Sequence, residues 1–165
     1  MGTGGLFLRR LRARVSDRPT GFVWVERGRL AGTGYPSSRG QLRWLIDQGV
    51  SSILTLTPDP LPKDLTEGLP LTLGHVPMQD HAPPDQPSLD AAVKFLTERL
   101  GEGKSVAVHC LAGEGRTGCV LAAYLIKTKG MAADDALRSI RELKPELVES
   151  RQESSVREFA SRVLN

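Results

Sequence analysis

The stretch that decides the fold is Val106–Gly118, which reads VAVHCLAGEGRTG. Its apolar start, Val106 to Val108, predicts a buried parallel strand. Such a strand delivers the residues that follow it to the carboxyl edge of a sheet, where open α/β sheets bind their ligands. The end of the stretch, Arg116–Gly118, predicts the opening of a helix. The segment is therefore expected to form a strand, a ligand-binding loop and a helix.

The loop between strand and helix has the composition of an anion pocket. It begins at Cys110, and Gly113 and Gly115 allow its backbone to curl without Cβ clashes, so that several N–H groups converge on one centre. A helix N-terminus and the guanidinium of Arg116 face the same centre, which predicts a site for a tetrahedral dianion. The same positive field favours the thiolate form of Cys110 at the floor of the pocket. The expected phosphate-binding residues are Leu111, Ala112, Gly113, Glu114, Gly115 and Arg116.

The full string His-Cys-x-Ala-Gly-x-Gly-Arg-Thr-Gly resembles the signature of the cysteine-dependent protein-tyrosine phosphatase superfamily. It is most similar to the small (atypical) dual-specificity phosphatases, over roughly residues 22–160. This resemblance implies hydrolysis of phosphomonoesters through a cysteinyl-phosphate on Cys110, with no cofactor. It also implies that Arg116 grips two phosphate oxygens, that Thr117 stabilises the sulfur as a leaving group, and that His109 supports the cysteine.

A second informative stretch is HVPMQDHAPPDQPS, residues 75–88, whose prolines stiffen a loop that follows a strand. It resembles the loop on which the family carries its general acid, and Asp80 is the candidate. Asp85 is the alternative, although its position suits the capping of a helix better. The neighbouring His81 is either an ordinary loop histidine or a residue that tunes the acid.

Four further residues carry alternatives. Tyr35, in a glycine-proline loop, either forms one wall of the pocket or is packed. Gln152 either positions the hydrolytic water, as in some family members, or lies on a surface helix. Glu114 is a carboxylate at the expected pocket rim, which disfavours highly charged inositol phosphates. Cys119 is either a buried structural cysteine or a partner that traps oxidised Cys110.

The pattern of apolar runs and turns predicts one α/β domain with a mostly parallel sheet of about five strands flanked by helices. The resemblance implies that this is a protein-tyrosine-phosphatase-like fold. The expected strands are 22–25, 30–31, 52–56, 71–76 and 105–109, and TPDPLPKD (57–64) is expected to be loop. The expected helices begin at Ser37 or Ser38, Ser88, Thr117, Asp134 or Asp135, and residue 151. Residues 1–20 are predicted to be an Arg-rich extension, and residues 21–165 a dual-specificity phosphatase catalytic domain.

Composition sets the remaining expectations. The chain has 165 residues and a net charge of +3, and residues 1–18 carry five arginines against Asp17. The body is thus close to neutral, which argues against a nucleic-acid partner. Residues 6–15 could form a basic amphipathic helix that contacts an anionic membrane or an acidic partner, an organellar presequence, or a solvated extension.

The two cysteines suit a reducing cytoplasm, and no apolar run is long enough to span a bilayer. The histidines lack the spacing of a metal site, and a monomer is expected. The expected partner is a phosphoprotein or a small phosphomonoester. Three other functions stay open: a phospho-binding module without activity, a phosphoinositide or small-molecule phosphatase, and an arsenate reductase or sulfur transferase.

Overall fold

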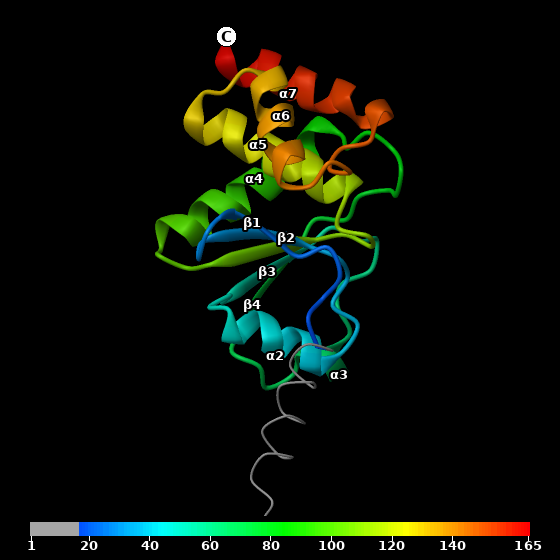
Figure 1. Ribbon diagram of the computed structural model, residues 1–165, viewed down its shortest axis with the longest axis vertical. Helices are drawn as coiled ribbons and strands as arrows, with labels where there is room; N and C mark the ends of the chain where they lie inside the picture. Colours follow the sequence, from blue (N-terminus) through cyan, green and yellow to red (C-terminus); the bar gives the residue numbers. More distant parts are fainter. Residues whose placement is uncertain (1–16) are drawn as a thin grey trace, which may run out of the picture.

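The computed structural model describes residues 17–165, a five-stranded sheet between two layers of helices (Figure 1). The basic segment at residues 6–15 lies outside the described residues. The strands are β1 (Val23–Glu26), β2 (Leu30–Thr33), β3 (Ser52–Thr55), β4 (Thr72–His75) and β5 (Val106–His109). They are ordered β1-β2-β5-β3-β4, and all neighbouring pairs are parallel except β1 and β2. The fold prediction of a mostly parallel sheet is confirmed.

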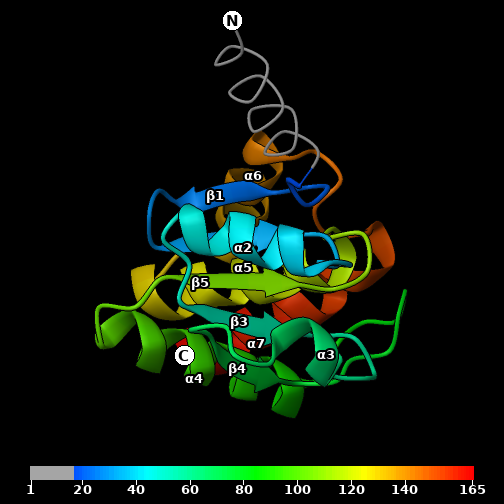
Figure 2. The same cartoon turned by 90° about the horizontal axis from the view of Figure 1, so that it is seen from below.

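Alternation along the strands builds two cores, one on each face of the sheet. In β5, Val106 and Val108 face the larger core with α4, α5, α6 and α7, whereas Ala107 faces the smaller one with α2. In β3, Leu54 belongs to the larger core and Ile53 to the smaller. Figure 2 shows α2 and α3 lying in front of the sheet, with the other helices behind it. Because β5 is covered on both faces, the loop that follows it begins in the buried interior, at Cys110.

The helices begin and end where local chemistry favours it. Ser38 caps α2 by accepting a hydrogen bond from Gln41 N, and Asp85 caps α4 through Ser88 N. Gly130 ends α5 in the left-handed conformation that glycine adopts without steric cost. The helices are α2 (Arg39–Asp47), α3 (Lys63–Thr66), α4 (Gln86–Gly101), α5 (Gly115–Lys129), α6 (Ala133–Leu143), the 3₁₀ turn η1 (Ser150–Gln152) and α7 (Glu153–Leu164).

The structure corrects the predicted elements in three places. The stretch 57–64 is not loop throughout, because α3 begins at Lys63 directly after the last proline, which is tolerated at a helix start. Asp134 and Asp135 lie in the first turn of α6 and do not cap it, since Ala132 holds the cap position. The helix after the cysteine loop begins at Gly115, two residues earlier than expected, so that the loop is shorter.

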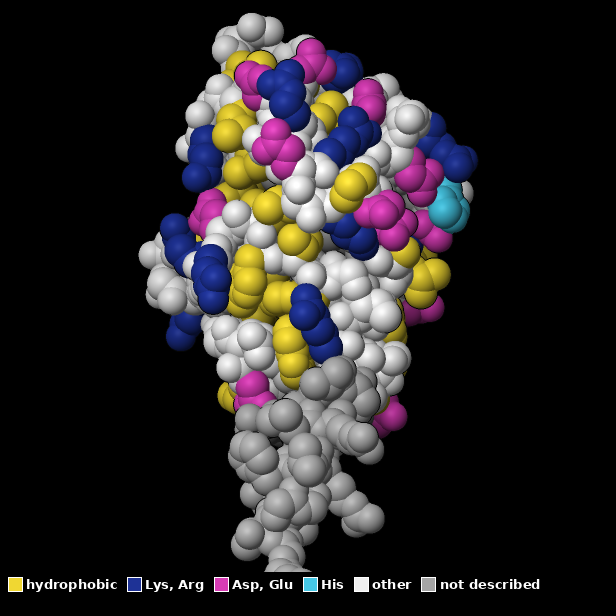
Figure 3. All heavy atoms as spheres, viewed as in Figure 1, with side chains coloured by type: hydrophobic (Ala, Val, Ile, Leu, Met, Phe, Trp, Pro, Cys, Tyr) yellow, Lys and Arg dark blue, Asp and Glu magenta, His cyan; other side chains and the backbone are white. Residues whose placement is uncertain are grey.

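The register of the sheet brings the central strands to a common edge. Thr33 of β2 and Thr55 of β3 are both aligned with His109, the last residue of β5. Cys110 therefore leaves the sheet at its centre, between two strands that end at the same level. Within residues 17–165 no helix combines the length and the apolar character that crossing a bilayer requires. Acidic and basic side chains are intermingled over the helical half of the surface in Figure 3.

Candidate active site

The loop Cys110–Glu114 is a tight curl between β5 and α5. Gly113 has a φ of 73°, and a Cβ at this position would lie 2.5 Å from the carbonyl of Thr33. Gly115 is required for another reason, since its Cβ would lie 2.5 Å from the side-chain oxygen of Gln152. The two glycines expected to permit the curl thus do so differently, one through its conformation and one through close packing.

The carbonyl groups of the loop face its scaffold. Leu111 O accepts a hydrogen bond from Tyr35 N at 3.0 Å, and Glu114 O accepts one from Gly118 N at 2.8 Å. Ala112 O faces Gly21 and Gly34 of the neighbouring backbone. In a planar trans peptide the N–H points opposite to the C=O of the same unit. The N–H groups that follow these carbonyls therefore face the concave side of the loop, as an anion site requires.

Cys110 lies at the floor of this curl, with 2% of its surface exposed. Its sulfur accepts a hydrogen bond from the Thr117 hydroxyl, with 3.1 Å between Oγ1 and Sγ. Thr117 is fully buried in the first turn of α5, so its side chain has no freedom to turn to solvent. The structure thus brings together the sulfur and the hydroxyl that the sequence places seven residues apart.

Arg116 is buried in the first turn of α5, with 2% of its surface exposed. Its Nη1 donates to Met78 O at 3.2 Å, and its Nη2 lies 3.0 Å from Asp80 Oδ1. Its Nε is buried and has no partner among residues 17–165. A buried guanidinium with an unpaired donor is costly unless an acceptor is supplied. An oxyanion in the cysteine loop would supply one.

Asp80 is the carboxylate that reaches the loop, across the ion pair with Arg116. Its side chain is 45% exposed, so it lies at the mouth of the site and can meet a substrate group. Asp85 instead accepts a hydrogen bond from Ser88 N at 2.8 Å as the cap of α4. The geometry thus places Asp80 at the site and gives the alternative, Asp85, the capping position.

His109 is a fully buried histidine behind the cysteine. Its pKa is lowered to about 4, chiefly by burial and also by the nearby charge of Arg116, although its hydrogen bond to Cys110 O acts in the opposite direction. The imidazole is therefore neutral at neutral pH. Nδ1 carries the hydrogen because Cys110 O can only accept, at 3.0 Å, and Nε2 then accepts from the Thr55 hydroxyl at 2.8 Å. The His109 ring thus links the Cys110 carbonyl to Thr55, the last residue of β3.

Gln152 and Tyr35 both lie against the site. Gln152 is fully buried, so the interpretation as a surface-helix residue is wrong. Its Oε1 accepts from Glu149 N at 3.1 Å, and its Nε2 donates to Ala82 O in the acid loop at 3.3 Å. The partly buried Tyr35 packs edge-on against the ring of His109, with 5.4 Å between the centroids.

The rim of the loop carries a cation that the sequence did not indicate. Lys144 Nζ lies 3.6 Å from Glu114 Oε1 and donates to Gly113 O at 3.5 Å. The carboxylate of Glu114 is therefore paired at the rim, and the ammonium group of Lys144 offsets part of its negative charge. No sequence signal links the two residues, since Lys144 follows α6 at a distance of 30 residues along the chain.

Cys119 lies on α5, away from solvent, and is fully buried. The pKa of its thiol is raised to about 12, chiefly by burial and also by the neighbouring Cys110. A thiol in this state is a poor nucleophile, which favours the structural interpretation over a redox partner for Cys110. Within the described part of the chain, His, Cys, Asp and Glu side chains form no group of three suited to a metal ion.

Gly113 provides a test of the loop geometry. We expect Gly113→Ala to destabilise the protein severely, because the new Cβ meets backbone atoms of Thr33 and Gly34 that cannot move independently of β2. Gly130→Ala is the matched control, since its φ of 65° is similar but its Cβ would meet open space. It should cost only about 1 kcal/mol. Thermal unfolding of both variants measures the difference, and equal losses would contradict the packing argument.

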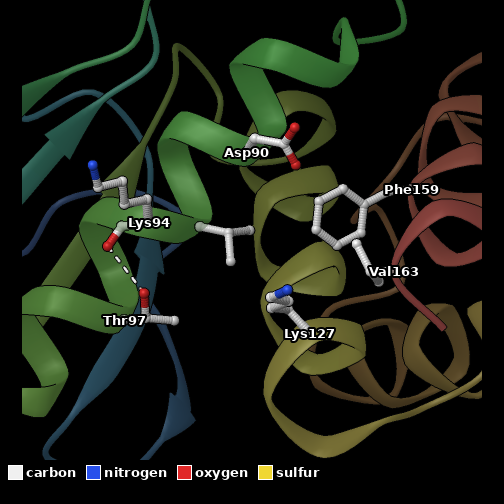
Figure 4. A pocket seen from close by; sticks show the side chains of 7 residues that line it. Asp90, Lys94, Thr97, Lys127, Phe159 and Val163 are labelled. Carbon is white, nitrogen blue, oxygen red and sulfur yellow. Dashed lines mark hydrogen bonds between the residues drawn. The ribbon is translucent and has the colours of Figure 1, made fainter.

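A separate hollow of about 310 Å³ lies between α4, α5 and α7. Phe159 and Val163 of α7 lie on one side of it and Lys94 and Thr97 of α4 on the other, with Lys127 of α5 between them (Figure 4). It contains none of the residues of the cysteine loop. The hollow and the curl of the cysteine loop are therefore separate features of the molecule.

Comparisons with known proteins agree with this geometry. The family model described as "Swiss Army Knife protein, DSP-PTPase phosphatase domain" matches residues 19–159. The chain is 33% identical over 99 residues to the dual specificity protein phosphatase Mpk3 of Drosophila melanogaster, covering 59% of this chain and 24% of the relative. It is 48% identical over 68 residues to the protein tyrosine phosphatase domain-containing protein 1 of Mus musculus, covering 41% and 9%. The chain spans about a quarter or less of these relatives.

Solved structures cover nearly the whole described chain. The crystal structure of Tk-PTP in the active form superposes with a TM-score of 0.77 at 27% identity, covering 86% of this chain and 97% of that one. The kinase associated phosphatase superposes with a TM-score of 0.76 at 20% identity, covering 88% and 96%, and this second likeness concerns the fold alone.

Proposed function

The chain belongs to the family of DSP-PTPase phosphatase domains, and from that premise we propose that it hydrolyses phosphomonoesters through a cysteinyl-phosphate intermediate. We assign this activity to a catalytic domain at residues 21–165. The proposed substrates are phosphotyrosine and also phosphoserine and phosphothreonine in proteins. The observation that carries the proposal is the buried Arg116, which follows the cysteine loop in the first turn of α5 and pairs with the carboxylate of Asp80 with 3.0 Å between Nη2 and Oδ1.

In the first step the Cys110 thiolate attacks phosphorus in line and the bond to the leaving oxygen breaks. The inward-facing N–H groups of the loop and the Arg116 fork hold the phosphate oxygens as charge moves onto them. Phosphate and Asp80 compete for Nη2, so substrate binding frees the carboxyl group to approach the leaving oxygen. Once released from the guanidinium, Asp80 takes up a proton from solvent, and the resulting carboxylic acid gives that proton to the leaving oxygen.

In the second step a water attacks the cysteinyl-phosphate. Asp80, now a carboxylate, takes a proton from the water, and Cys110 leaves as a thiolate. The Thr117 hydroxyl, 3.1 Å from the sulfur, stabilises that thiolate by donating a hydrogen bond. We assign the orientation of this water to Gln152, whose amide contacts Glu149 N and Ala82 O and packs against Gly115 at the end of the cysteine loop.

A phosphoinositide substrate is the second candidate, and the pairing of Glu114 with Lys144 favours keeping it. Because Lys144 offsets part of the charge of the carboxylate at the rim, a highly charged head group meets less repulsion there. A phosphatase assay of the full chain with chelator present, using p-nitrophenyl phosphate, phosphopeptides and short-chain phosphoinositides, tests both. Turnover of aryl phosphate and phosphopeptides is expected, turnover of phosphoinositides alone would favour the second candidate, and none at all would contradict both.

We expect Asp80→Asn to slow turnover of an aryl phosphate by roughly 10²–10⁴-fold, because the amide has no proton to give at the leaving oxygen. Asp85→Asn is the matched control on the same loop. Asparagine caps a helix about as well as aspartate, so this variant should retain both activity and stability. Steady-state kinetics of the two variants tests the assignment of the general acid to Asp80. A large loss in Asp85→Asn with near wild-type turnover in Asp80→Asn would assign the general acid to Asp85 instead.

A further inference from the structure

We propose that His81 is a positioning residue for the general acid: it holds one carboxyl oxygen of Asp80 so that the other oxygen faces the phosphate. The inference rests on the proposed hydrolase function and assigns a part in it to a residue that makes no contact with the cysteine loop. Two features of the site carry it, the division of contacts between the two oxygens of Asp80 and the backbone conformation of His81.

The two carboxyl oxygens of Asp80 have different partners. Oδ1 lies 3.0 Å from Arg116 Nη2 and accepts a hydrogen bond from the backbone N–H of His81 at 3.0 Å. Oδ2 lies 3.4 Å from Nε2 of the His81 ring. When a phosphate takes the guanidinium of Arg116, Oδ2 keeps its neighbour and the carboxyl group stays over the loop. Oδ1, the oxygen directed at Arg116, is then the one that meets the leaving group.

The ring of His81 is itself fixed from the other side. Its Nδ1 lies 2.8 Å from Glu149 Oε1, and Glu149 Oε2 lies 2.9 Å from Arg151 Nε. Glu149 also caps η1 in a reciprocal arrangement with Gln152. The groups that face His81 are therefore Asp80 on its own loop and Glu149, with Arg151 behind it, on η1. The imidazole connects the acid to the segment that carries Gln152.

The backbone supports the same interpretation. His81 has a φ of 59°, and within residues 17–165 the only other non-glycine residue with a positive φ is Val148, at 64°. His81 directly follows Asp80 in the chain, and Val148 directly precedes Glu149. Asp80 and Glu149 are the two carboxylates that flank the imidazole. Left-handed backbone at residues with a Cβ is unfavourable and persists where surrounding contacts determine it. At His81 the contacts of the ring to Glu149 and Asp80 act in this way. Val148 is held separately, by a hydrogen bond from Arg141 Nη2 to its carbonyl.

The rest of the acid loop is held against α7 and η1, so the ring acts on a loop that is already docked. Gln152 Nε2 donates to Ala82 O, the Ser155 hydroxyl donates to Pro84 O, and Gln86 Nε2 donates to Ser155 O. Removing the imidazole should therefore leave the loop in place while it releases the Asp80 side chain. A positioning role predicts a defect in proton transfer rather than in folding or binding.

The test compares substrates whose leaving groups differ in their need for a proton. Full-length wild type, His81→Gly and His81→Asn are assayed with p-nitrophenyl phosphate, a good leaving group, and phenyl phosphate, a poor one. Glycine removes the ring and suits the left-handed backbone, whereas asparagine tolerates that backbone and keeps a donor near Nδ1 for Glu149. Both lose the contact to Asp80 Oδ2. We expect kcat to fall about tenfold with the first substrate and on the order of a hundredfold with the second.

A double-mutant cycle separates this role from a structural one. In the Asp80→Asn background, His81→Gly should cause no further loss, because the residue acts through the acid. Equal losses with both substrates, additive losses with Asp80→Asn, or wild-type kinetics in His81→Asn would each overturn the proposal while the hydrolase function stands. A wild-type chain that turns over neither substrate would overturn the proposed function as well.

Discussion

Cys110→Ser is expected to abolish turnover of aryl phosphates, with a loss on the order of 10⁵-fold or more, and to leave the fold intact. A serine hydroxyl is far less ionised than a thiol, and His109 cannot act as its base because both ring nitrogens are engaged, by Cys110 O and the Thr55 hydroxyl. The Thr117 hydroxyl now donating to sulfur would donate to the serine oxygen equally well. Stopped assays at high enzyme concentration measure the residual rate.

Cys119→Ser is the matched control, because that cysteine is buried in α5 and takes no part in the proposed reaction. It should keep turnover close to wild type, with any loss confined to thermal stability. Turnover near the wild-type rate in Cys110→Ser would contradict the proposed mechanism through a cysteinyl-phosphate. Loss of activity in Cys119→Ser with the fold retained would contradict the structural role assigned to Cys119.

Arg116→Lys is expected to reduce kcat/KM by on the order of 10³-fold although the positive charge is kept. The guanidinium bridges Met78 O and Asp80 with two nitrogens of one rigid plane. A lysine ammonium offers a single point of contact and cannot present two parallel donors to phosphate oxygens. Steady-state kinetics, together with the affinity for inorganic phosphate as a product inhibitor, measures the effect.

Arg138→Lys is the control for the loss of a guanidinium elsewhere. Arg138 is exposed on α6 and pairs with Asp135 at 3.0 Å, an interaction worth little in water. The control should match wild type in both activity and stability. An Arg116→Lys variant with wild-type phosphate affinity would show that a positive charge alone is enough to bind phosphate. It would contradict the argument that two parallel guanidinium donors are required.

The sequence was most informative where neighbouring residues perform one task. Cys110, Arg116 and Thr117 lie within one strand-loop-helix unit, so their spacing already determines that they meet. The capping position of Asp85 was equally readable, because a cap depends on residues within one turn. The five strands followed from apolar alternation, and only short features such as α3 were missed.

Contacts between distant segments could not be read in the same way. Glu149 is 68 residues from His81, and Lys144 is 30 residues from Glu114. The segment after α6 passes over the start of α5, where Val148 packs against Gly118. It has no repeating pattern of apolar residues from which this position could be predicted. The burial of Gln152 follows from that same passage. These residues needed the fold before their partners could be known.

The order of the strands places Cys110 and Asp80 after strands that are expected to differ in local stability. Cys110 follows the central strand β5, paired on both sides, whereas Asp80 follows β4, an edge strand with mostly exposed side chains. Amide hydrogens exchange slowly where opening requires global unfolding and quickly at such edges. The proposed nucleophile, Cys110, is therefore expected to follow a strand whose amides exchange slowly. The proposed acid, Asp80, follows a strand whose amides are expected to exchange faster, so its loop can open locally while the centre of the sheet stays folded.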